Sequence, residues 1–283
     1  MILFKSIKSI HGHLVSLRER QLSIGFVPTM GALHAGHLEL IKQCKSQQSV
    51  TIASIFINPT QFNDPADFKK YPVSIEKDIQ LLESAGCDML FLPSVGEIYP
   101  DGQQPATHYN LGSLEDLLEG YYRPGHFQGV CQVVHRLLDI IKPGHLYLGR
   151  KDYQQCMVIQ KMIDQTGLQT TVHMVPTIRE QDGLAMSSRN MRLSGTERKA
   201  AASIYRQLQM IHSLANKVDP DILQEQAAEN LLRDGFSKVD YVSIAHPDTL
   251  LPVTGWEKVG KAVILIAAFI GNVRLIDNLV IGD

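Results

Sequence analysis

The feature that most constrains this chain is a regular alternation of apolar runs with segments of helical periodicity. Five runs rich in β-branched residues are typical of strands: Ile24–Val27, Val50–Ile57, Met89–Leu92, Leu146–Leu148 and Thr170–Val175. Four segments between them carry apolar residues at helical spacing: His37–Gln47, Ile75–Ala85, Val130–Ile141 and Gln154–Thr166. The alternation predicts βαβ units with right-handed crossovers, and therefore an α/β fold with a doubly wound parallel sheet.

The pattern changes after Pro176, where a loop is expected to run through Asn190. Beyond it the periodicity predicts two helices and three strands: Thr196–Ala215, Pro220–Arg233, Val239–Ile244, Ala262–Ile270 and Arg274–Asp277. We therefore expect a Rossmann-like nucleotide-binding domain over residues 1-177 and a smaller α+β domain over residues 178-283.

Composition excludes several classes of protein. The chain has 283 residues, and its 27 Lys and Arg against 29 Asp and Glu leave a formal charge of -2, so no global basic field would hold nucleic acid. The four cysteines are widely spaced, which favours reduced thiols in a cytoplasmic protein over disulfides or a zinc knuckle. Neither a signal peptide nor a membrane helix is expected, because every apolar run is too short or interrupted by charge.

The first expected strand runs into Pro28-Thr29-Met30-Gly31-Ala32-Leu33-His34-Ala35-Gly36-His37, followed by an apolar helix. Backbone N–H groups and the dipole at a helix start favour a phosphate there. His34 and His37, three residues apart, could donate hydrogen bonds to one phosphate or leaving group. The spacing alone is equally compatible with surface histidines that flank a turn, while a zinc site would need further ligands.

Polar residues follow two further strands. Asn58 and Gln61 carry amide groups suited to a substrate with hydroxyl and carboxylate groups, although Asn-Pro is also a common turn opener. In the run from Gly149 to Gln155, Lys151 suits a phosphate, and Asp152 suits either a ribose hydroxyl or a helix cap.

The segment after the fifth strand ends in Met186-Ser187-Ser188-Arg189. It resembles the mobile K-M-S-K-S loop that accompanies H-x-G-H in nucleotidyl transferases, with hydroxyls and Arg189 in place of lysines. An ordinary polar hinge would have a similar composition, so the M-S-S-R motif indicates a nucleotide site only in combination with the H-A-G-H turn.

Taken together, the motifs resemble the pantothenate synthetase family (pantoate–β-alanine ligases) over essentially the whole chain. The family's elements occur in order: P-T-M-G-A-L-H-A-G-H, F-I-N-P-T-Q-F, Y-R-P-G-H-F-Q-G-V, K-D-Y-Q-Q, D-G-L-A-M-S-S-R-N and R-L-I-D-N-L. The resemblance implies ATP-dependent condensation of pantoate with β-alanine through pantoyl adenylate, with Mg²⁺ as cofactor and a homodimer as the assembly. It also implies that the second domain acts as a lid.

The resemblance also implies roles for individual residues. Catalytic roles would fall to His34, His37, Lys151, Ser187, Ser188 and Arg189, with His37 as proton donor. ATP would contact Met30, Gly31, Ala32, Leu33, His34, Ala35, Gly36, His37, Gly149, Arg150, Lys151, Asp152, Ile178, Met186, Ser187, Ser188 and Arg189. Pantoate and β-alanine would contact Gln61, Gln155 and Asn58, and no protein side chain is expected to ligate a metal.

Several further points qualify this resemblance. Arg150 stands where the family often has an acidic residue, and Arg123 and His126 belong to a loop expected near the site. Another H-x-G-H nucleotidyl transferase is an alternative, but the amides Asn58, Gln61 and Gln155 favour a neutral or carboxylate-bearing substrate over a phosphorylated one. An aminoacyl-tRNA synthetase is disfavoured because no basic anticodon-binding extension follows. A nucleotide-sensing protein without catalysis would be expected to lack the phosphate-contacting residues.

Overall fold

The computed structural model describes residues 1–62, 68, 71–102, 107–257 and 260–282. The chain divides into two compact units. The first comprises Met1–Arg150 and Gln155–Pro176, and the second comprises Lys151–Gln154 and Thr177–Asp283. The second unit thus begins one residue before the expected position 178 and also takes in a short segment from within the first unit's sequence.

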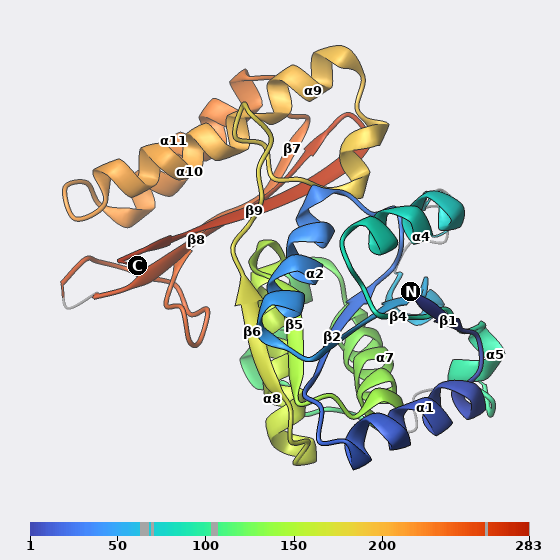
Figure 1. Ribbon diagram of the computed structural model, residues 1–283. Helices are drawn as coiled ribbons and strands as arrows, with labels where there is room; N and C mark the ends of the chain where they lie inside the picture. The colour runs from blue at the N-terminus through green and yellow to red at the C-terminus, as the bar shows by residue number, and fades with distance from the viewer. Residues whose placement is uncertain (63–67, 69–70, 103–106, 258–259, 283) are drawn as a thin grey trace. The chain divides into compact units, whose positions relative to one another are not determined.

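The described part of the first unit contains a six-stranded sheet whose strand order is β1-β4-β3-β2-β5-β6 (Figure 1). Every pairing in it is parallel. The strands are β1 (Ile2–Phe4), β2 (Ile24–Thr29), β3 (Val50–Ile55), β4 (Met89–Phe91), β5 (His145–Gly149) and β6 (Thr171–Val175). Residues of β3 are all buried, as expected of a central strand covered on both faces. The predicted α/β class is confirmed.

Helices cover both faces of this sheet. They are α1 (Ile7–Glu19), α2 (Ala35–Gln47), α4 (Ile75–Ser84), α5 (Val95–Ile98), α6 (Glu119–Tyr122), α7 (His126–Ile141) and α8 (Tyr153–Thr166). Right-handed crossovers place α2 and α4 on one face and α1, α7 and α8 on the other. The contacts of α2 with α4, and of α1 with α7, agree with that division (Figure 1).

The order of the strands creates a switch point between β2 and β5. From β2 the chain proceeds to β3 and β4 on one side, whereas from β5 it proceeds to β6 on the other. Crossovers that leave in opposite directions open a crevice beyond the carboxyl ends of these two strands. The H-A-G-H turn follows β2, and Gly149 ends β5, so both motifs lie at the position where this fold binds ligands.

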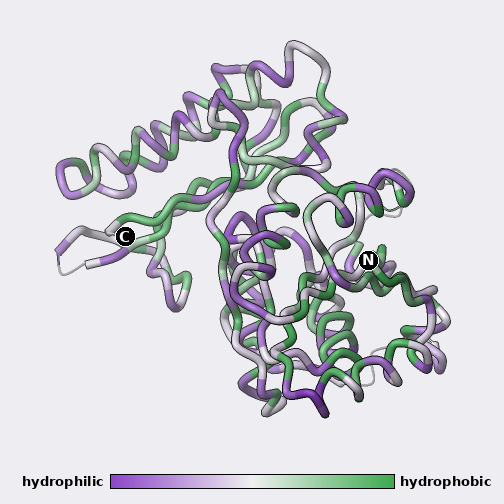
Figure 2. The backbone as a smooth tube through the Cα atoms, viewed as in Figure 1, coloured by the Kyte–Doolittle hydropathy of each residue, from purple (hydrophilic) through white to green (hydrophobic). Residues whose placement is uncertain are grey.

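The second unit contains a three-stranded antiparallel sheet, in the order β7-β8-β9, among its described residues. Its elements are α9 (Gly195–Ala201), α10 (Ser203–Leu214), α11 (Pro220–Arg233), β7 (Lys238–Ala245), β8 (Ala262–Ile270) and β9 (Val273–Ile281). The apolar run of β8 is a buried strand, as expected, and is continuously hydrophobic in Figure 2. Its side chains share a core with α10 and α11.

Short 3₁₀ turns complete the two units: η1 (Pro59–Gln61), η2 (Gly112–Glu115), η3 (Arg150–Asp152) and η4 (Ser188–Arg192). None of the described helices combines the length and the apolar character that a membrane crossing requires.

Candidate active site

A strained turn connects β2 to α2. Gly31 has φ +81° and Ala32 has φ +49°, so two successive residues adopt the left-handed region, which costs little for glycine but is unfavourable for alanine. The Gly31 N–H donates to Thr29 Oγ1 at 3.2 Å, and that hydroxyl donates to the Ser54 carbonyl of β3 at 2.8 Å. The end of β2 is therefore tied to its neighbour before the chain turns.

Asp78 of α4 holds this turn from the side. Its carboxylate accepts hydrogen bonds from the backbone N–H groups of Ala32 (2.9 Å) and Leu33 (2.8 Å), and from the Ser74 hydroxyl (3.1 Å). The side chain is 1% exposed, so these bonds offset the cost of burying a carboxylate. Sequence reasoning missed Asp78, because one acidic residue on an amphipathic helix normally faces solvent.

The two histidines cap α2. The Gly36 N–H donates to His34 Nδ1 at 3.2 Å, and the His34 N–H donates to His37 Nδ1 at 3.3 Å, which together form a reciprocal capping box. A ring nitrogen that accepts carries no proton, so in the neutral ring the proton lies on Nε2. The ring centroids are 4.0 Å apart. The turn thus presents two adjacent imidazoles of one tautomer, with His34 at the cap position and His37 in the first turn of the helix.

Gln61 lies at the end of η1, next to the same turn. Its Nε2 donates to the Met30 sulfur at 2.8 Å, and its carbonyl is 2.8 Å from His126 Nδ1 at the start of α7. His126, which was expected near the site, thus contacts Gln61. Gly129 permits the approach of η1 to α7, since a Cβ there would collide with the Thr60 carbonyl oxygen.

Asn58 is buried, with 1% exposure, and its amide is engaged within the protein. Its nitrogen donates to Gln61 Oε1 and to the Gly129 carbonyl, each at 3.2 Å. Its oxygen accepts from the Thr60 backbone and hydroxyl and from the Tyr99 hydroxyl, the last at 2.9 Å. Burial raises the pKa of Tyr99, so this phenol stays a donor at neutral pH. Asn58 therefore fixes the position of Gln61.

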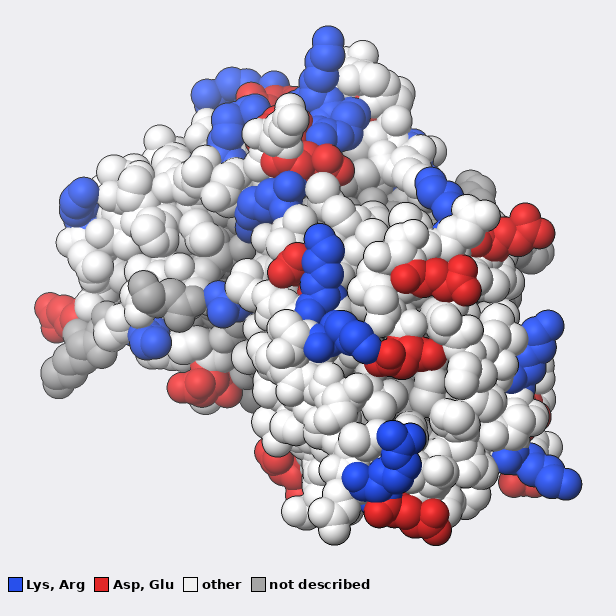
Figure 3. All heavy atoms as spheres, in the orientation of Figure 1, with Lys and Arg blue, Asp and Glu red and all other residues white. Residues whose placement is uncertain are grey.

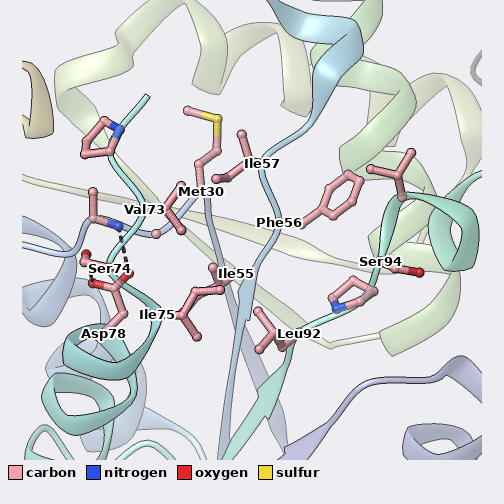
Figure 4. Close-up of a pocket in the computed structure, with 15 residues that line it drawn as sticks. Met30, Ile55, Phe56, Ile57, Val73, Ser74, Ile75, Asp78, Leu92 and Ser94 are labelled. Atoms are coloured by element: carbon pink, nitrogen blue, oxygen red, sulfur yellow. Dashed lines mark hydrogen bonds between the residues drawn. The ribbon is translucent and has the colours of Figure 1, made fainter. Parts of the chain in front are cut away.

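A cavity of about 210 Å³ lies beside the turn, at the carboxyl ends of β2, β3 and β4 (Figure 4). Its wall is mainly apolar and includes Met30, Ile55 and Leu92. Asp78 and Ser74 lie on one side of it, and Ser94 lies on the other. The cavity shares the segment 30–32 with the H-A-G-H turn, but Gln61 and the histidines do not line it.

The Lys151 segment belongs to the second unit. The Lys151 carbonyl accepts a hydrogen bond at 2.8 Å from the Asn278 side chain of β9, and the Tyr153 hydroxyl donates to the Pro247 carbonyl at 3.1 Å. Lys151 Nζ lies 3.8 Å from Asp152 Oδ1. Asp152 ends η3 immediately before α8, which agrees with the expected position near a helix start.

A short hairpin carries the M-S-S-R motif. The Met186 N–H donates to the Ile178 carbonyl at 2.9 Å, which brings together two of the residues expected to contact ATP. Ser187 caps η4 by accepting from the Arg189 N–H at 3.3 Å. At the hairpin tip, the hydrogen bond from Arg198 lowers the pKa of Asp182.

Basic residues gather near this motif. Arg189 and Arg192 lie in η4, and Arg198 and Lys199 follow in α9. In Figure 3, Lys and Arg side chains cluster with a few acidic ones toward the top of the view, over the part of the second unit that carries α9. This cluster is a local concentration of positive charge in a chain whose formal net charge is -2.

The expected site residues thus fall into two sets, one in each unit. The first unit contributes Met30, Gly31, Ala32, Leu33, His34, Ala35, Gly36, His37, Asn58, Gln61, Gly149, Arg150 and Gln155. The second contributes Lys151, Asp152, Ile178, Met186, Ser187, Ser188 and Arg189.

The chain is similar in sequence to known proteins over most of its length. The profile of a family described as Pantoate-beta-alanine ligase matches residues 2–280. A pantothenate synthetase of Cytophaga hutchinsonii is 45% identical over 283 residues, which covers 99% of each chain. One from Dehalococcoides mccartyi is 48% identical over 259 residues, covering 90% of this chain and 95% of the relative.

Solved structures give the same result. The pantothenate synthetase of Thermus thermophilus superposes with a TM-score of 0.91 at 41% identity, covering 99% of each chain. A pantoate-beta-alanine ligase from Francisella tularensis, complexed with beta-gamma ATP and beta-alanine, superposes with a TM-score of 0.84 at 41% identity, covering 99% of this chain and 97% of that one.

Proposed function

This chain belongs to the Pantoate-beta-alanine ligase family, and from that premise we propose how its residues perform the reaction. The enzyme is a carbon–nitrogen ligase that joins pantoate to β-alanine at the expense of ATP. Because the family profile matches residues 2–280, the chain is neither another kind of H-x-G-H nucleotidyl transferase nor an aminoacyl-tRNA synthetase.

The chemical problem is that a carboxylate does not condense with an amine at neutral pH. In the first step, a carboxylate oxygen of pantoate attacks the α-phosphorus of ATP, and the bond to the bridging oxygen breaks. Pyrophosphate leaves with the electron pair, and pantoyl adenylate remains. In the second step, the β-alanine nitrogen attacks the acyl carbon, AMP leaves with its oxygen, and the nitrogen loses a proton.

The imidazole cap on α2 is the observation that carries this proposal. Both Nδ1 atoms accept backbone N–H groups, so the neutral rings of His34 and His37 can donate through Nε2. Directed at the phosphates, these donors would stabilise the negative charge gained by departing pyrophosphate. Lys151 and Arg189 would add positive charge, while Ser187, Ser188, Ile178 and Met186 would close over the nucleotide.

Pantoate would bind near Met30, on the side where Gln61 lies. Gln61 has an amide beside that sulfur, and we propose that it and Gln155 hold pantoate and later β-alanine. For Asn58 we propose a positioning role, because its own amide is engaged by Gln61, Gly129, Thr60 and Tyr99. A closed pocket would keep water away from the mixed anhydride.

We propose that Mg²⁺ enters this site as an ion carried by the triphosphate. Among the described residues, no group of three His, Cys, Asp or Glu side chains gathers to form a protein-held site. Mg²⁺ typically keeps water and phosphate oxygens as ligands and takes only one or two carboxylates from the protein. Asp152 is the carboxylate that the Lys151 segment can offer, and the ion would neutralise phosphate charge.

Two further features are proposed from the family resemblance alone. We expect a homodimer and a cytoplasmic location for the enzyme. Sedimentation of the purified protein tests the first, and a mass equal to that of a single chain would contradict it.

The reaction is tested by pantoate-dependent exchange of labelled pyrophosphate into ATP. We expect exchange in the wild type and a loss of several orders of magnitude in His37→Ala or Lys151→Ala, with unchanged circular dichroism. His212→Ala, which alters an exposed histidine of α10, is the matched control and should retain full exchange. Binding of ATP without any exchange would favour a protein without catalysis.

A further inference from the structure

The dipeptide Asp277-Asn278 lies in the middle of β9, within the R-L-I-D-N-L motif. Each residue is only 3% exposed, although β9 pairs with the apolar strand β8. Burial of a carboxylate and an amide in such a sheet is costly unless both are hydrogen-bonded. Neither residue is among those proposed to touch ATP, pantoate or β-alanine, so the motif needs another explanation.

Asp277 holds Arg179 in a two-point contact. Arg179 donates to the two carboxylate oxygens at 2.5 and 3.1 Å, and it also donates to the carbonyls of Gly183 (3.1 Å) and Asn278 (3.2 Å). Its guanidinium lies 4.0 Å from the centroid of the Tyr205 ring. Arg179 forms one side of the hairpin and bridges to Ala185, so these contacts fix the hairpin on β9.

Tyr205 fits closely against the turn of that hairpin. Gly183 has φ +90°, and a Cβ there would overlap the Tyr205 ring. Any other residue would therefore both strain the backbone and collide with the ring. The hairpin is thus held from β9 and from α10 within the second unit.

Asn278 connects the same position of β9 to the Lys151 segment. Its side-chain nitrogen donates to the Lys151 carbonyl at 2.8 Å, and its backbone N–H donates to Asp277 Oδ1 at 2.8 Å. Two neighbouring residues of one strand therefore hold two segments of the chain, one at Lys151 and one at Arg179, which are 28 positions apart in sequence.

We propose that Asp277 and Asn278 are positioning residues for the nucleotide: Asn278 holds Lys151 in place, and Asp277 acts through Arg179 on the hairpin that presents Ile178 and Met186. This inference rests on the proposed contact of Lys151 with phosphate. Stability alone would be a weak reason for the arrangement, because apolar residues of similar volume often replace a buried ion pair without loss.

A double-mutant cycle tests the proposal. Asn278→Ala should raise the KM for ATP and lower kcat/KM for pyrophosphate exchange about tenfold or more, because Lys151 loses its fixed position. Lys151→Ala keeps the backbone carbonyl and removes the side chain beyond Cβ, including the ammonium group. If Asn278 acts through Lys151, the double variant should match Lys151→Ala within about twofold.

The matched control is Asn230→Ala. Asn230 also donates from its amide to a partner in the second unit, Gln207 Oε1 at 3.0 Å, but it does not touch the Lys151 segment. It should change stability without changing the KM for ATP. Hydrogen exchange provides a second readout, since amides of residues 151–154 should exchange faster in Asn278→Ala only.

The outcomes separate the two ideas. Losses that multiply in the double variant, or unchanged exchange of residues 151–154 in Asn278→Ala, would overturn the positioning role while leaving the proposed function intact. Full pyrophosphate exchange by Lys151→Ala would instead remove Lys151 from the chemistry, and the inference would fall with it.

Discussion

Two imidazoles and one carboxylate determine the conformation of the chain between β2 and α2. His34 and His37 satisfy backbone N–H groups at the helix start, and Asp78 satisfies two more in the turn before it. The side chains proposed for chemistry also help to build the backbone that presents them. Substitution of either histidine therefore removes a proposed phosphate donor and also weakens the N-terminal cap of α2. A residue that contacts only the turn gives a cleaner test of whether the shape of the turn matters.

Asp78 is that residue. Asp78→Asn should lower the rate of pyrophosphate exchange at least tenfold, because an amide places a donor against one of two buried N–H groups and leaves it unsatisfied, at a cost of about 1–3 kcal/mol. The measurement is exchange rate together with thermal unfolding. Glu76→Gln changes an exposed acid on the same helix and should be silent. Equal activity of both variants would show that the turn keeps its shape without the carboxylate.

At the scale of elements, the contact of η1 with α7 determines where Gln61 lies. Gly129→Ala should destabilise the protein by about 1–3 kcal/mol and raise the KM for pantoate, because the new methyl group must displace the backbone of Thr60 and Gln61. Urea unfolding and steady-state kinetics measure the two effects. Gly96→Ala, in helix α5 with open space around its Cβ position, is the control. A variant with normal KM would separate Gln61 from substrate binding.

Long periodic elements could be predicted from sequence, and α11 and β8 begin and end where expected. The differences between the predicted and the observed elements have physical causes. The helix expected over Thr196–Ala215 is divided at Ala202, where no glycine or proline signals a break. β9 continues past Asp277 to Ile281, because pairing with β8 outweighs the weak strand propensity of Asn278. The sequence patterns did not predict β1, which has only three residues, or α1, in which polar and charged residues interrupt the apolar ones.

At the scale of the molecule, a histidine pair makes stability depend on pH. His145 Nδ1 lies 3.0 Å from His173 Nε2, and such a bond requires one nitrogen without a proton. Burial, and secondarily His145, lower the pKa of His173 below its usual 6.5. The unfolded chain therefore binds this proton more readily than the folded one, so the contribution is complete above pH 6.5 and is lost as the pH falls through the lowered folded value.

We therefore expect the free energy of unfolding to decrease as the pH falls below about 6.5, and to decrease less steeply in His173→Gln. Urea unfolding at several pH values gives both slopes. His11→Gln, which changes an exposed histidine of α1, should retain the wild-type slope. If the free energy of unfolding depended on pH in the same way in the wild type, His173→Gln and His11→Gln, the histidine pair would not be responsible for the loss of stability at low pH.

The site could be predicted in outline because its motifs follow strand ends, and parallel strands bring their ends to one edge of a sheet. The residues that hold these motifs in place through hydrogen bonds could not be predicted from the sequence. Asp78 reaches the turn from 46 positions away, and Asn278 reaches Lys151 from 127 positions away. Such contacts depend on tertiary packing, and no local pattern around either residue marks them.

The segment Lys151–Gln154 has a practical consequence for anyone dividing the protein. A cut after Pro176 would yield two fragments of plausible size, yet it would leave Lys151 and Tyr153 on the piece that lacks Asn278 and Pro247. Each fragment would then expose donors or acceptors that the intact chain pairs. Separately expressed halves are therefore not expected to reproduce the contacts of this four-residue stretch.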